Sequence, residues 1–146
     1  MRVVLTRESV CMGDDAEAPH ETAWEVDGGA TLADVLEQAA GCCPHLRRGC
    51  WIAHLGYNRP DGAPLALLAP QWPRPRVLLG ADAQAELGAH SDELEIFWGY
   101  RSGADPEALW RQLGGGQVHE PLRSVESRPG WLRFSRRRRP RRRSAA

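Results

Sequence analysis

The cysteine and histidine residues between positions 42 and 54 are of the types that bind metal ions. Tetrahedral zinc takes its ligands from thiolate sulfur and imidazole nitrogen, and this stretch offers five such side chains. On an extended strand Cys50 and His54 would lie about 13 Å apart, too far for both to bind one ion. A zinc site could therefore combine Cys42, Cys43 and His45 with one of the two later residues, and the candidate ligands taken here are Cys42, Cys43, His45 and Cys50. The alternative is that the thiols pack as small apolar groups, because no Cys-x-x-Cys pair is present.

A second arrangement that could do chemistry is Cys11 with His20, since a thiol and a histidine base can form a nucleophilic pair. Three carboxylates, those of Asp14, Asp15 and Glu17, lie between them and disfavour a thiolate. The sequence has no phosphate-binding glycine loop, no Gly-x-Ser-x-Gly turn and no His-Glu-x-x-His helix. We therefore assign no catalytic residue and expect no cofactor.

Trp72 lies in a segment rich in proline and arginine, between Pro70 and Arg76. Proline disfavours regular structure there, and a loop tryptophan beside arginines is typical of a recognition hot spot. The alternative is a tryptophan that folds over the core. The candidate partner-binding residues are Asp14, Asp15, Trp72, Arg74 and Arg76.

The charges divide the chain into two parts, although the formal net charge is zero. Residues 1–113 contain 17 acidic and 9 basic residues, whereas residues 114–146 contain 2 and 10. The first part has the apolar periodicity and the length of one folded domain, and the second has few residues that could form a core. We expect an acidic domain over 1–113 and a flexible, disordered basic tail over 114–146.

The tail ends in seven arginines, which are Arg136, Arg137, Arg138, Arg139, Arg141, Arg142 and Arg143. Three interpretations stay open for them: contact with nucleic-acid phosphates, contact with an acidic protein surface, or an extension without function. The chain contains no lysine, so arginine content by itself reflects composition bias as much as selection. Sequence-specific reading of nucleic acid is not expected, because no basic folded face accompanies the tail.

The apolar pattern predicts the elements that must position these residues. Alternation and β-branched or aromatic residues predict strands over 2–10, 22–26, 50–57, 65–69, 77–79 and 93–100, and 82–87 resembles a helical turn. Apolar residues spaced three and four apart predict a helix after Thr31, with Thr31 as its cap and Gly41 as a left-handed terminating residue. A second helix is expected to begin after Asp105, where Pro106 takes the first position.

This order of strand, strand, capped helix and further strands resembles the β-grasp, or ubiquitin-like, architecture. The segment Ala30 to Leu36 is similar to the helix entry of small sulfur-carrier and ubiquitin-like proteins. The opening segment Leu5 to Asp15 resembles that of small bacterial proteins with no assigned function. The resemblance implies an α+β fold, with a mixed sheet packed on one main helix and a C-terminal helix added. Ubiquitin-like proteins are conjugated or loaded with sulfur at a C-terminal glycine. The glycines from Gly114 to Gly116 depart from that pattern, because they follow a helix and 30 residues lie beyond them.

Function is therefore expected to lie in binding. The leading hypothesis is a small non-catalytic module that binds another protein, as an adaptor, an inhibitor or an immunity-type factor. The alternatives are a cysteine- or metal-dependent enzyme or redox protein, and association with nucleic acid through the tail. The start of the chain lacks a signal-peptide core and no run of 18 apolar residues occurs, so we expect a cytoplasmic protein with reduced thiols and no membrane contact.

Overall fold

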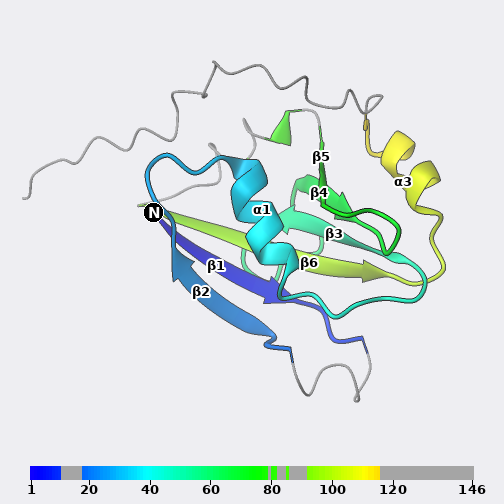
Figure 1. Ribbon diagram of the computed structural model, residues 1–146, viewed down its shortest axis with the longest axis horizontal. Coiled ribbons are helices and arrows are strands. Elements are labelled where there is room, and N and C mark those ends of the chain that lie inside the picture. The colour runs from blue at the N-terminus through cyan, green and yellow to red at the C-terminus, as the bar shows by residue number, and fades with distance from the viewer. Residues whose placement is uncertain (11–17, 79, 82–84, 86–91, 116–146) are drawn as a thin grey trace, which may run out of the picture.

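The computed structural model describes residues 1–10, 18–78, 80–81, 85 and 92–115, and these residues fold as one α+β unit (Figure 1). The described part contains six strands and two helices. In chain order they are β1 (Arg2–Arg7), β2 (Glu21–Glu25), α1 (Leu32–Ala40), β3 (Cys50–Leu55), β4 (Pro64–Leu68), β5 (Arg76–Val77), β6 (Glu93–Arg101) and α3 (Pro106–Gln112).

All six strands form one mixed sheet in the order β2-β1-β6-β3-β4-β5. The central pair, β1 and β6, is parallel, with Leu5 opposite Ile96, and the other four pairs are antiparallel. The first and last strands of the described residues are therefore neighbours, and β6 joins β2-β1 to β3-β4-β5. The predicted mixed sheet and main helix are confirmed.

Helix α1 crosses one face of the sheet (Figure 1). Its apolar stripe of Leu32, Val35, Leu36 and Ala39 is buried against that face. The helix begins with the predicted cap, in which the Thr31 hydroxyl accepts from the Asp34 amide at 3.1 Å and the Asp34 carboxylate accepts from the Thr31 amide at 2.8 Å. This reciprocal pair satisfies amides that a helix start leaves without partners.

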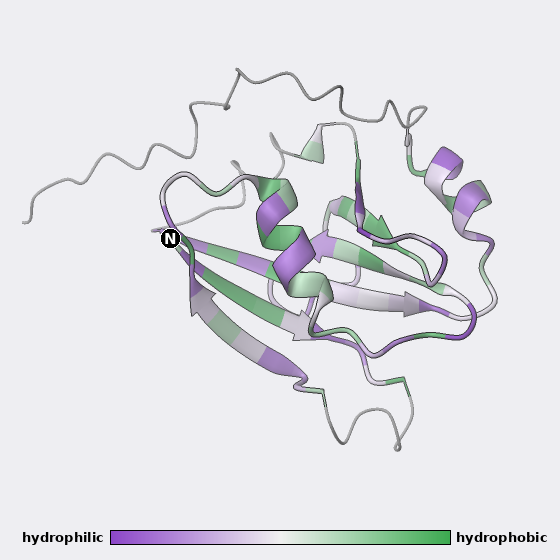
Figure 2. Ribbon diagram, in the orientation of Figure 1, coloured by the Kyte–Doolittle hydropathy of each residue, from purple (hydrophilic) through white to green (hydrophobic). Residues whose placement is uncertain are grey.

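The core lies between α1 and the sheet. Trp51 and Trp98 are 1 % and 0 % exposed, and the alternation that places Trp98 inward also buries Leu94 and Ile96. Figure 2 shows this apolar interior against the hydrophilic ends of β2. The prediction that Leu94, Ile96, Trp98 and Tyr100 share one face is confirmed by their register with β1 and β3.

Helix α3 packs through Trp110, which is 6 % exposed and meets Trp72 edge to face at 6.3 Å between ring centroids. Asp105 caps α3 by accepting from the Glu107 amide at 3.0 Å, and Pro106 takes the first helical position as predicted. No helix in the described residues is long and apolar enough to cross a membrane.

Two predicted details were wrong. Gly41 has φ −61°, in the right-handed region, because the chain continues through further turns after α1, with the Cys42 and Cys43 amides donating to Ala39 and Ala40. The first and third strands end at Arg7 and Leu55, earlier than expected, and Gly56 turns the chain with φ +109°. The predicted helical turn over 82–87 lies largely outside the described residues.

Candidate functional site

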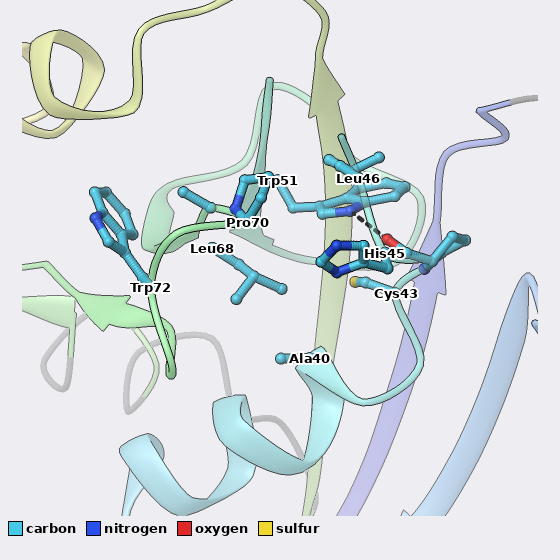
Figure 3. Close-up of a pocket in the computed structure, with 10 residues that line it drawn as sticks. Ala40, Cys43, His45, Leu46, Trp51, Leu68, Pro70 and Trp72 are labelled. Carbon is cyan, nitrogen blue, oxygen red and sulfur yellow. Dashed lines mark hydrogen bonds between the residues drawn. The ribbon is translucent and has the colours of Figure 1, made fainter. Parts of the chain in front are cut away.

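A pocket of about 170 Å³ lies where the C-terminal end of α1 meets β3 and the loop after β4 (Figure 3). Most of the residues that line it have apolar side chains, among them Leu46, Trp51, Leu68, Pro70 and Trp72. The indole Nε1 of Trp51 donates to the Pro44 carbonyl at 3.3 Å, which fixes the loop between α1 and β3. The pocket thus combines a rigid aromatic wall with a loop that carries Cys43 and His45.

Cys43 and His45 both line this pocket, with Cys42 beside them in the chain, whereas Cys50 does not. Cys50 is fully buried in β3, and strand alternation turns it to the face opposite Trp51. Burial raises the pKa of the Cys42, Cys43 and Cys50 thiols, an effect that Arg7 opposes at the first two. Protonated thiols are poor nucleophiles and poor metal ligands at neutral pH.

The candidate zinc ligands are thus divided between the two faces of the sheet. Among the described residues, no three histidine, cysteine, aspartate or glutamate side chains are gathered so that they could hold a metal ion. His54 shares the face of Cys50, is 7 % exposed, and bonds through Nδ1 to the Gly62 carbonyl at 2.9 Å. Its Nε2 is buried without a hydrogen-bond partner, and burial lowers its pKa, so the ring is neutral at pH 7.

The structure brings Trp72 and Arg76 together in a stacked contact. Trp72 is only 8 % exposed, and the Arg76 guanidinium lies 3.8 Å from its ring centroid and bonds to Glu107 at 2.9 Å. Arg74 is exposed and pairs with Glu37 at 3.4 Å. Trp72 therefore folds over the core, which leaves it little surface to offer to a partner. Cys11, Asp14, Asp15 and the seven arginines of the tail lie outside the described residues.

A second hollow, of about 360 Å³, opens beside the first and shares Pro70 with it. Arg47 and Arg48 line it together with Gln71 and the turn that precedes α3. Seven of the nine arginines in the described residues donate hydrogen bonds or form ion pairs through their guanidinium groups. Within this part of the chain, Arg47 and Arg48 are the two that do not.

The outer strand β2 presents a different kind of surface. Glu21, Ala23 and Glu25 are exposed along it, and Tyr57, 46 % exposed, lies beside them. The Tyr57 hydroxyl donates to Glu21 at 2.6 Å, and its amide donates to Glu95 at 3.2 Å. The hydrogen bond to the Glu21 carboxylate raises the pKa of Tyr57, so the phenol stays neutral.

Sequence reasoning missed Arg47, Arg48 and Tyr57 as candidate residues. The adjacent arginines in an acidic domain were a usable signal, but nothing local shows that Pro70 and the 103–106 turn enclose them. No family model, curated protein or solved structure matches this chain.

Proposed function

We propose that this chain is a non-catalytic protein-binding module with a β-grasp domain, and that it binds a partner by strand addition at β2. The β-grasp assignment is supported by the order β2-β1-β6-β3-β4, by the parallel β1–β6 pair and by a helix that follows the first hairpin and crosses the sheet. The observation that carries the binding proposal is the outer edge of β2, with which no strand in the described residues pairs.

The hydrogen-bond register defines that edge. Arg7 donates to the His20 carbonyl at 3.0 Å, and Met1 and Val26 bond in both directions at 2.9 and 3.3 Å. In an antiparallel pair, inward and outward residues alternate. The backbone N–H and C=O groups of Thr22 and Trp24 therefore point toward β1. Those of the alternate residues point outward, where no described residue pairs with them; these residues are Glu21, Ala23 and Glu25.

The opposite edge of the sheet is closed to this kind of pairing. Strand β5 has two residues and follows Pro73 and Pro75, and short strands and prolines are devices that block edge pairing. Strand β2 has five residues and no proline. Edge strands of this length accept an extended peptide through main-chain bonds.

Charge indicates the kind of partner. Glu21 and Glu25 flank Ala23 on the exposed face of β2, so two copies of this strand would repel each other. A strand with arginine or lysine at alternate positions would place positive charge against these glutamates, and Tyr57 adds an aromatic ring for a cation. The partner segment we infer is extended and basic.

The test uses an acetylated and amidated peptide of alternating valine and arginine, titrated into the full chain by calorimetry. Ala23→Pro removes an outward amide without touching the β1–β2 ladder, so at least a tenfold loss of affinity is expected. Ala23→Thr keeps the amide and should bind like the parent chain. A peptide with N-methylated alternate amides has the same charge and should bind at least tenfold more weakly.

Equal affinity of the parent chain for the methylated and unmethylated peptides would overturn strand addition, because only charge would then matter. Binding that is unchanged in Ala23→Pro would overturn the choice of edge. Thermal melts of both Ala23 variants, followed by circular dichroism, show whether the sheet has stayed intact.

A further inference from the structure

The pocket beneath α1 and the arginine hollow beside it lie at the far side of the sheet from β2, with β1, β6 and β3 between. Neither is used by the proposed strand addition. Together they combine two features of small-molecule sites, an apolar recess and a few convergent polar groups.

The size of the apolar pocket limits what can enter it. A cavity of about 150 Å³ lined by apolar side chains accommodates one benzene ring. This pocket has about 170 Å³, and Leu46, Trp51 and Trp72 form part of its wall (Figure 3). The Trp51 N–H is already bonded to the Pro44 carbonyl, so this indole offers its ring, and no free donor, to the recess. One aromatic ring or a short branched chain fits it.

The arginine hollow supplies the opposite chemistry. Arg47 and Arg48 are exposed, lack ion-pair partners among the described residues and line a space of about 360 Å³. Planar guanidinium groups bind carboxylates through paired hydrogen bonds. The nearby Asp105 carboxylate already accepts from the amide of Glu107 at the start of α3. Two arginines without ion-pair partners among the described residues, in a domain rich in acidic residues, are suited to bind an anionic ligand.

The two hollows are neighbours, because Pro70 lines both and Leu46 of the first is followed directly by Arg47 of the second. We propose that they form one site for a small amphipathic carboxylate, with its apolar group in the pocket and its carboxylate on Arg47 and Arg48. A monoanion is favoured over a dianion, because residues 1–113 carry eight more acidic than basic residues and repel added negative charge.

Two sources share this chemistry: a free aryl or branched-chain acid, and the C-terminus of a peptide whose last side chain is apolar. The probes are phenylacetate, acetate, 2-phenylethanol and an acetylated Gly-Gly-Phe tripeptide with a free carboxylate. They are titrated into the full-length chain, and the indole N–H signals of its tryptophans are followed by NMR. Phenylacetate should shift the signals of Trp51 and Trp72, which line the pocket, and leave those of Trp24 and Trp98 in place.

Acetate and 2-phenylethanol should each bind at least tenfold more weakly than phenylacetate, because each lacks one half of the ligand. Tighter binding of the tripeptide than of phenylacetate would identify a chain terminus as the ligand, and weaker binding would identify a free acid. A neutral alcohol that binds as well as phenylacetate, or the absence of saturable shifts for every carboxylate probe, would overturn the proposal.

Variants test the two halves separately. Arg47→Gln with Arg48→Gln should weaken phenylacetate binding about tenfold, the scale of a hydrogen bond to a charged group. Arg2→Gln with Arg59→Gln removes the same charge elsewhere and should have no effect, and the arginine tail is present in both proteins. Ala40→Leu should fill the pocket and block binding, whereas Ala33→Leu, on the exposed side of α1, should not. Equal loss in both arginine pairs would overturn the site, and that comparison stands even where Ala40→Leu fails to fold.

Discussion

The Arg76 guanidinium carbon lies over the Trp72 ring, 3.8 Å from the ring centroid, and the same guanidinium bonds to Glu107 on α3 at 2.9 Å. One side chain thus holds the loop after β4 to α3. We expect Arg76→Leu to lower the free energy of unfolding by about 1–2 kcal/mol, since cation–π and partly exposed ion-pair terms are both lost. Urea denaturation of the parent chain and of Arg76→Leu measures this difference in the free energy of unfolding.

Arg74→Gln is the matched control for that variant. Arg74 and Glu37 are 74 % and 50 % exposed, so their pair contributes at most about 0.5 kcal/mol in water. A loss in Arg76→Leu no larger than in Arg74→Gln would show that the stacking on Trp72 has little energetic weight.

The capping box of α1 gives a second prediction. Thr31→Ala removes the oxygen that accepts from the Asp34 amide and should cost about 1 kcal/mol. Thr31→Ser keeps this hydroxyl and should cost much less. Equal urea midpoints for Thr31→Ala and Thr31→Ser would contradict the assigned role of the hydroxyl.

His54 predicts how stability depends on pH. Burial and Arg101 hold its pKa in the folded chain below the ordinary 6.5, although the bond to Gly62 and the charge of Asp61 oppose this. The unfolded chain therefore binds a proton more readily as the pH falls below 6.5. The free energy of unfolding should fall there and level off once the pH is below the folded-state pKa.

His54→Asn tests this because its amide can still donate to Gly62 but does not titrate. Urea titrations at pH 7.5 and pH 5 should show a larger loss of stability for the parent chain than for His54→Asn. The same loss in both proteins would assign the pH dependence to other groups.

The raised thiol pKa values predict slow alkylation. In a Cys11→Ser background, Cys42, Cys43 and Cys50 should react with iodoacetamide more slowly than free cysteine at pH 8, because less thiolate is present. The rates at Cys42 and Cys43 should rise as the pH is raised and more thiolate forms, and mass spectrometry of the modified peptides measures each site. Fast labelling at neutral pH would instead favour the cysteine-dependent alternative.

Much of the fold was predictable because its signals are local. The alternation from Leu94 to Tyr100 and the cap at Thr31 depend on neighbours within a few residues, and both are confirmed. The turn at Gly41 was predicted wrongly because glycine permits the left-handed conformation without requiring it. The further turns through Cys42 and Cys43 hold Gly41 in the right-handed conformation.

The candidate sites were less predictable because they depend on contacts between distant segments. The local sequence predicts that Trp72 lies on a loop, and its burial depends on contact with Trp110, 38 positions later. Arg47 and Arg48 line a hollow only because the turn at 103–106, more than 50 residues later, forms another part of its wall. The position of β2 at the edge of the described sheet follows from the strand order, which amino-acid periodicity does not specify.

The place of β6 between β1 and β3 also determines when the chain can fold. Arg2 pairs with Glu93, so the middle of the sheet closes a loop of about 90 residues. Topologies dominated by such distant pairs fold slowly, in milliseconds to seconds. During synthesis, β1 to β5 leave the ribosome before β6, which is the strand that joins β2-β1 to β3-β4-β5. A nascent chain that stops before Glu93 is expected to leave the inner edges of β1 and β3 unpaired, and unpaired strand edges make such species prone to aggregation.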